Sequence, residues 1–404
     1  MADLLGFASI TVVAFITLIV ATKWPDISRI LLVAFSVRVI LMLLGYYIFT
    51  LPDSTYDALG FEWGAWNFAK DGFFNVMDKY PGPNSAFYRW MIAIPYSLFG
   101  RSLLMAQSLS LLFGLGAVFL GWLLAKKLWD NHTAKKVGWI LALFPSLVLY
   151  SVLTLREIYV CFFLIVAMFG VVNWVRDDSY KSIFLAMFGF IGGTFFHGGI
   201  IIGGMIFGII VLTRSIKKVS KLILFLRISP KNLLIVILSL IFLQLYFSNK
   251  IHIAKLGKFK DSIDLNRLQF ETSNRLRGEA SYPEWTKVNS PSEFITKGFI
   301  RVLYLLFSPF PWDIKKPAHL VGMFDGFLYL TLVYLIFLNR KSIWNDPALR
   351  TIFFILVVYF IIFGIGVSNF GAGTRHRAKF VIELIILAAP FIPKFSFNIK
   401  KIKE

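Results

Sequence analysis

Cysteine and charged residues are scarce in this sequence. Cys161 is the single cysteine, so the chain has neither an intrachain disulfide nor a cysteine-cluster metal site. Only 16% of the 404 residues are charged, whereas a soluble chain carries roughly a quarter. The phosphate-binding patterns G-x-x-x-x-G-K-[ST] and G-x-G-x-x-G and the zinc-binding pattern H-E-x-x-H are absent. These absences argue against a soluble protein, ATP-driven transport and zinc-dependent hydrolysis.

Hydrophobic residues dominate the composition of the chain. They make up 57% of the chain, and Phe alone occurs 43 times. Several apolar runs are long enough to cross the roughly 30 Å hydrocarbon core of a bilayer. The sequence therefore predicts an all-α polytopic membrane protein with a single transmembrane domain over residues 1–404. We expect about eleven spans, at residues 5–22, 30–50, 102–125, 137–153, 158–175, 183–196, 198–213, 232–247, 318–338, 351–368 and 380–393.

The net charge of +20 is distributed in a way that predicts the orientation of the spans. Four basic segments fall on one side of the membrane, and they are residues 126–136, 214–231, 339–350 and the tail from Lys394. Lys and Arg in short loops mark the cytoplasmic side. The N-terminus is then outside and the C-terminus in the cytoplasm. The positive charge serves orientation and contact with anionic lipid headgroups rather than nucleic-acid binding.

The loops on the opposite side are longer and more mixed in charge. We expect loops 51–101 and 248–317 to form an extracytoplasmic cap. Two apolar segments within these loops, 86–99 and 294–311, would break the topology if they crossed the membrane. The sequence therefore predicts that both are helices in the outer interface.

An acidic cluster that contains Asp53, Tyr56 and Asp57 follows directly after the second span. A carboxylate at the mouth of the helix bundle could accept a proton from an acceptor hydroxyl, or bind a divalent cation such as Mg²⁺ or Mn²⁺. The alternative is a solvated turn in which Asp53 caps a helix over residues 55–69. The tyrosine and the second aspartate favour the functional interpretation, because capping needs only one of these residues.

Two further polar groups are predicted to lie at the same face. Arg156 and Glu157 are adjacent at membrane depth, which is costly unless they are paired or face a cavity. An ion pair that closes a helical hairpin is the alternative role. His197 lies among glycines that permit close approach of helices, although a lone histidine is more often a structural hydrogen-bonding group. Glu157 and His197 join the aspartates as candidate catalytic residues, and Arg156 and Tyr56 as candidates that line the substrate.

The densest basic cluster on this side lies between the last two spans. Arg375, His376 and Arg377 follow a glycine-rich stretch whose backbone N–H groups could turn inward. Guanidinium forks match phosphate oxygens bidentately, so the cluster predicts a site for a lipid phosphate or diphosphate that Asn369 also lines. Arg301, in the predicted interfacial segment, could add to this site. Positive residues that merely flank a helix are the alternative, but the positive-inside rule argues against them here.

The order of these clusters resembles that of the GT-C superfamily of membrane glycosyltransferases. The similarity is a scattered pattern over most of the chain, and the stretches that carry it are residues 53–57, 96–100, 144–157, 308–312 and 373–377. The last two stretches, the first of which ends at Trp312, look similar to bacterial members from cell-surface polysaccharide loci.

The resemblance implies transfer of a sugar from a polyprenyl-phosphate or polyprenyl-diphosphate donor at the outer side of the bacterial inner membrane. It implies that Asp53 is the general base and that Arg375 and Arg377 hold the phosphate leaving group, with Trp312 lining the substrate. The Asp-Glu pair of the protein mannosyltransferases is absent, which favours a glycan or glycolipid acceptor. The expected partners are the lipid-linked donor, this acceptor and other polysaccharide-assembly proteins.

Two other functions fit the same pattern. A polymerase of lipid-linked repeat units, for O-antigen or capsule, would also have outward arginines, and Arg267, Arg275 and Arg277 in loop 248–317 suit it. A transporter of lipid-linked glycans should carry polar residues through the midplane and often shows inverted repeats. Here the polar clusters gather at one end and no repeat is visible, so the transporter ranks below the two enzymes.

Overall fold

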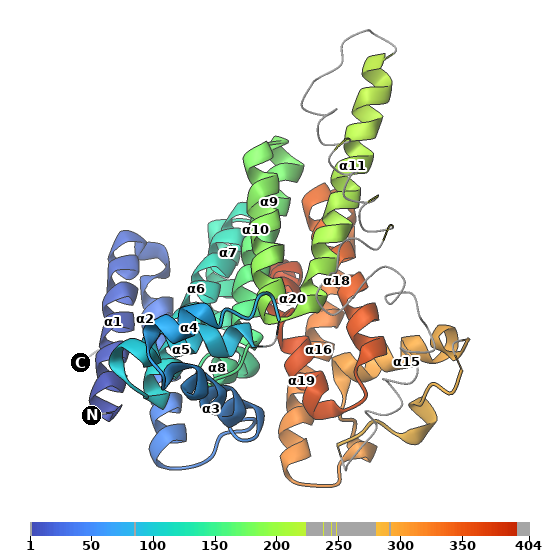
Figure 1. Ribbon diagram of the computed structural model, residues 1–404. Helices are drawn as coiled ribbons and strands as arrows, with labels where there is room; N and C mark the ends of the chain where they lie inside the picture. The colour runs from blue at the N-terminus through green and yellow to red at the C-terminus, as the bar shows by residue number, and fades with distance from the viewer. Residues whose placement is uncertain are drawn as a thin grey trace, which may run out of the picture.

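The computed structural model describes residues 2–223 and 280–393, apart from Ser85 and Pro291, and the isolated positions Ile237, Gln244 and Ser248. This part of the chain consists of α-helices, a few single-turn 3-10 helices and the segments that connect them, with one isolated bridge, and most of its long helices run along a common axis (Figure 1). Its helices are α1 (Ala2–Lys23), α2 (Pro25–Tyr47), α3 (Asp57–Ala69), α4 (Phe73–Asp78), α5 (Phe87–Phe99), α6 (Leu103–Leu128), α7 (Asn131–Leu143), α8 (Pro145–Tyr150), α9 (Glu157–Asp177), α10 (Tyr180–Phe196), α11 (Ile201–Ile223), α15 (Glu293–Phe307), α16 (Ala318–Leu338), α17 (Arg340–Asn345), α18 (Pro347–Gly366), α19 (Phe370–Ala378) and α20 (Val381–Ala388).

Seven of the described helices are long and apolar enough to cross a bilayer, so the fold is that of a polytopic membrane protein. They are α1, α2, α6, α9, α11, α16 and α18. α10 and Val381–Phe391 are apolar but shorter, and they correspond to the predicted spans 183–196 and 380–393. Phe327 of α16 is 62% exposed, as suits a surface that meets lipid chains. The predicted span 232–247 lies outside the described residues, so the total of eleven stays a prediction.

The predicted span 137–153 is not one continuous helix, because the chain breaks at Pro145 between α7 and α8. Proline has no N–H to donate to the carbonyl of Leu141, four residues earlier. Arg38 of α2 is fully buried and supplies donors at this break. Its Nη2 donates to Leu141 O at 3.2 Å and its Nη1 to Ala142 O at 2.7 Å. An arginine inside an apolar helix thus donates hydrogen bonds to backbone carbonyl groups at a proline kink.

Ion pairs gather several basic loops at one end of the helices, toward the top of Figure 1. Asp26 at the start of α2 pairs with Lys126 and Lys135 at 3.3 and 2.9 Å. Arg176 near the end of α9 pairs with Asp346, directly before α18, at 3.4 Å. The predicted basic segments 126–136 and 339–350 therefore lie at the same end, and their cytoplasmic placement stays a prediction. The segment 224–231 and the tail from Lys394 lie outside the described residues.

The opposite end carries α3, α4 and α5, which come from the predicted cap loop 51–101 (Figure 1). α5 matches the predicted interfacial segment 86–99, and it packs against α3. α15 matches most of the segment 294–311, although it ends before Pro309. The other predicted cap loop, 248–317, is described only from residue 280 onward and at Ser248.

Close contact with α10 fixes the position of α9. A Cβ atom at Gly170 would lie 2.2 Å from the backbone N of Ala186, and one at Gly189 would lie 2.3 Å from the backbone N of Ala167. Only glycine lets two helix backbones approach this closely. The tight pair matters for function, because the first residue of α9 is Glu157.

Candidate functional site

The loop after α2 holds two residues in a strained backbone conformation. Asp53 has a φ of +58° and Tyr56 a φ of +44°. Residues with a side chain adopt such angles rarely, and the examples concentrate at functional sites. The N-cap of α3 is Tyr56, so the alternative in which Asp53 caps this helix is wrong. Tyr56 itself is 92% exposed at the rim of the site.

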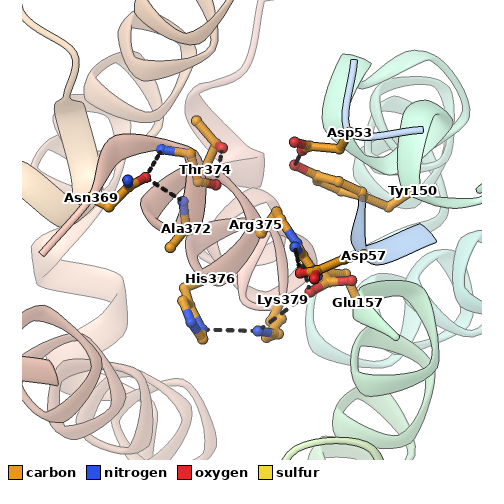
Figure 2. A network of polar contacts seen from close by, with 11 residues as sticks. Asp53, Asp57, Tyr150, Glu157, Asn369, Ala372, Thr374, Arg375, His376 and Lys379 are labelled. Atoms are coloured by element: carbon orange, nitrogen blue, oxygen red, sulfur yellow. Dashed lines mark hydrogen bonds and ion pairs between the residues drawn. The ribbon is translucent and has the colours of Figure 1, made fainter. Parts of the chain in front are cut away.

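The side chain of Asp53 is directed at Tyr150 of α8 (Figure 2). The buried tyrosine hydroxyl donates to Asp53 Oδ2 at 2.9 Å. Burial raises the pKa of Asp53 above its usual value, while the Tyr150 hydrogen bond and the charge of Arg375 act in the opposite direction. A carboxylate with a raised pKa is a better proton acceptor than a solvated one.

Arg375 of α19 bridges two acidic residues from distant parts of the chain. Its Nη1 lies 2.5 Å from Asp57 Oδ2, and its Nε lies 3.3 Å from Glu157 Oε1 (Figure 2). Asp57 is exposed at the start of α3, whereas Glu157 is buried at the start of α9. Burial disfavours the charged form of Arg375, but the attraction of Glu157 and the hydrogen bond to Asp57 outweigh it and raise its pKa. The structure thus brings together three residues predicted from separate segments.

Lys379 is a buried cation at this site that the sequence motifs did not predict. Its Nζ lies 3.8 Å from Glu157 Oε1 and 2.9 Å from His376 Nδ1. It follows Arg375 by four residues, a spacing that places both on one helical face and that could have revealed it. The ring of the buried His197 lies 5.2 Å from that of His376. We call the following set the polar cluster: Asp53, Asp57, Glu157, Arg375, His376 and Lys379.

The glycine-rich stretch before Arg375 is helical, which corrects the expectation that its backbone N–H groups turn toward an anion. α19 begins directly after Asn369, which is its N-cap. Asn369 Oδ1 accepts from the N–H groups of Gly371 and Ala372 at 2.8 and 3.2 Å (Figure 2). These donors are therefore already satisfied, and Asn369 acts as a helix cap rather than as a residue that lines a substrate.

Arg377 does not belong to the polar cluster, although it was predicted to bind phosphate. It is fully buried, and each of its three guanidinium nitrogens has a protein acceptor. The acceptors are the Asp325 carboxylate and the carbonyl oxygens of Leu306, Ser308 and Gly322. A guanidinium has five N–H donors; four of them are hydrogen-bonded to the protein here, and Nη2 also lies 2.7 Å from Asp325 Oδ2. Arg377 therefore holds α19 against α15 and α16.

Arg301 is likewise fully buried and bound to the protein. Its Nη2 donates to Val367 O and to Ser368 Oγ, both at 2.7 Å. It positions the loop that leads into α19, which does not fit its predicted role as a phosphate ligand. Trp312 is 73% exposed and stacks on Phe310 with ring centroids 4.9 Å apart, and its described contacts do not include the polar cluster.

The polar cluster suits proton transfer and the binding of charged groups. Within the residues that the structure describes, no group of three or more His, Cys, Asp or Glu side chains is placed to hold a metal ion. Comparisons of the chain with protein-family models, with curated proteins and with solved structures found no match. The function must therefore be argued from the site itself.

Proposed function

We propose that this protein is a membrane glycosyltransferase of the GT-C type. It transfers a sugar from a polyprenyl-phosphate or polyprenyl-diphosphate donor to a glycan or glycolipid acceptor at the extracytoplasmic face of the bacterial inner membrane. The observation that carries the proposal is the convergence of Asp53, Asp57 and Arg375 at one end of a bundle of long apolar helices. A lipid-linked donor has its tail in the bilayer and its sugar at this level.

The proposed reaction gives separate roles to Asp53, to Tyr150 and to the cations near the site. Asp53 takes the proton of the acceptor hydroxyl, and its raised pKa supports this role. Tyr150 holds the carboxylate in place. The acceptor oxygen forms a bond to the anomeric carbon of the sugar while the bond to the phosphate oxygen breaks. The phosphate leaves with negative charge, which cations near the site stabilise.

The position of the polar cluster along the helices supports the choice of membrane face. Its residue Glu157 begins α9, whereas Arg176 near the other end of α9 pairs with Asp346 in the basic loop 339–350, and the basic loop 126–136 lies at that same end (Figure 1). If those loops are cytoplasmic by the positive-inside rule, the polar cluster is extracytoplasmic.

No specific observation favours the alternative functions. The arginines that suit a repeat-unit polymerase, Arg267, Arg275 and Arg277, lie outside the described residues. A transporter needs polar groups that line a path through the bilayer. The buried charges of Arg38 and Asp325 are instead engaged with the protein itself.

The test is surface glycan in cells that produce Asp53→Asn or Arg375→Ala at the normal protein level. We expect loss of the glycan, or loss of one sugar from it, in both variants. Asp71→Asn is the matched control, because Asp71 is an exposed carboxylate in the same cap whose described partners are Lys79 at 3.6 Å and Asn75 at 3.1 Å, both outside the polar cluster. Unchanged glycan in Asp53→Asn and Arg375→Ala would overturn the proposal. A ladder of products that collapses to one repeat would select the polymerase.

A further inference from the structure

Two arginines beside the polar cluster lie over the same aromatic ring. The guanidinium carbon of Arg156 lies 4.8 Å from the ring centroid of Phe61, and that of Arg89 lies 5.4 Å from it. The three residues come from different elements, since Phe61 belongs to α3, Arg89 to α5, and Arg156 precedes α9. Gly64 leaves room for this arrangement, because a Cβ atom there would lie 2.6 Å from Arg89 Cδ.

Within the described part of the chain, neither arginine forms an ion pair with an acidic side chain. Among the described residues, the side chains of Arg89 and Arg156 form no hydrogen bond and no ion pair within 4.0 Å, and Nε of Arg156 is buried without an acceptor. The neighbouring Arg101 shows the contrast, because it forms a two-point ion pair with the buried Glu62 at 2.7 and 2.8 Å. Burial lowers the pKa of Arg156, and the charge of Glu157 only partly offsets this effect.

The positive charges near the Phe61 ring and the polar cluster outnumber the negative charges. Asp53, Asp57 and Glu157 supply three carboxylates, and the cations are Arg89, Arg156, Arg375 and Lys379. Asp57 and Glu157 already pair with Arg375 and Lys379, and Asp53 accepts a hydrogen bond from Tyr150. A cation over an aromatic ring is stabilised by roughly 0.5–1 kcal/mol at an exposed site, but two like charges over one ring repel each other. An anion that binds both guanidinium groups removes this repulsion.

We propose that Arg89 and Arg156 form the binding site for the phosphate groups of a lipid-linked donor. Planar guanidinium groups bind phosphate oxygens through pairs of N–H donors. Two guanidinium groups match the two phosphate groups of a diphosphate better than they match a single phosphate. The inference rests on the proposed function, and it moves the phosphate site from the 375–377 motif, where the arginines are already engaged, to the junction of α3, α5 and α9.

The test is binding of lipids of equal chain length to the full-length protein in detergent micelles. The probes are polyprenyl diphosphate, polyprenyl phosphate and the uncharged polyprenol. We expect Arg89→Gln and Arg156→Gln each to weaken binding of the diphosphate by about tenfold or more, since each removes charged hydrogen bonds. Polyprenol binding should stay unchanged in both. Lys70→Gln, which removes an exposed cation from the end of α3, is the matched control and should bind all three lipids normally.

Unchanged diphosphate binding in both variants would overturn this inference, and the proposed function would still stand if Asp53→Asn abolishes the glycan. Equal binding of polyprenol and polyprenyl diphosphate by the unmodified protein would overturn both. Inorganic diphosphate serves as a competitor. If it displaces the lipid at equal concentration, the site binds a soluble phosphate compound, and the assignment to a lipid donor is wrong.

Discussion

Arg375 Nε lies 3.3 Å from Glu157 Oε1, and this contact joins α19 to the first turn of α9 across 218 residues of sequence. Lys379 approaches the same carboxylate oxygen at 3.8 Å. One buried carboxylate therefore compensates two cations of one helical face. Asp57, which also contacts Arg375, is largely exposed to solvent.

Glu157→Gln should destabilise the protein more than Asp57→Asn does. Removal of one partner from a buried ion pair costs about 3–5 kcal/mol, whereas an exposed pair contributes about 0–1 kcal/mol. Glu157 has 3% of its side chain exposed and Asp57 has 64%. Thermal unfolding of the purified variants in one detergent measures the difference. Equal unfolding temperatures would contradict the role given to Glu157.

Tyr150→Phe should shift the pH dependence of sugar transfer. The Tyr150 hydroxyl stabilises the ionised form of Asp53 and so lowers its pKa. Its removal raises the pKa of Asp53 further, and a base with a higher pKa loses its proton only at higher pH. The acidic limb of the kcat/KM profile, which reports the base in the free enzyme, should therefore move to higher pH. A uniform loss of rate at every pH would indicate that Tyr150 has a structural role only.

Arg377→Met should be destabilising, and a second substitution should rescue it. The single change leaves the carboxylate of Asp325 buried without its partner, at a cost of about 3–5 kcal/mol. Asp325→Leu removes that unpaired charge, so the double variant should be more stable than Arg377→Met alone. Thermal unfolding again provides the measurement. If Arg377 bound phosphate instead, the double variant would stay as stable as the original protein but lose lipid binding.

The orientation in the membrane can be measured because Cys161 is the single cysteine and is buried. Thr55→Cys and Ser342→Cys introduce thiols at exposed positions. Thr55 lies in the loop that holds Asp53, and Ser342 lies in α17, beside the Arg176–Asp346 pair at the other end of α9. A membrane-impermeant maleimide should label Thr55→Cys in intact spheroplasts and Ser342→Cys only after the membrane is opened. The reverse pattern would place the polar cluster in the cytoplasm and contradict an extracytoplasmic reaction.

The helices were predictable to a large extent, because the length of an apolar run is a local property of the sequence. Predicted spans such as 5–22 and 158–175 lie within α1 and α9. The break at Pro145 shows the limit of this approach. Hydropathy is the same on both sides of a proline, but the missing N–H ends the helix and places Tyr150 beside Asp53.

The apolar runs of the sequence indicated a chain that enters a membrane, and its polar clusters indicated Asp53, Asp57, Glu157 and Arg375 as candidates for a chemical role. The sequence could not distinguish Arg375 from Arg377, which are two residues apart in one basic motif. On a helix such residues point in different directions, so Arg375 meets carboxylates of α3 and α9 while Arg377 is buried against α16. Which arginines are neutralised, and which are left for a ligand, depends on partners that are distant in sequence. These partners come together only when the helices pack.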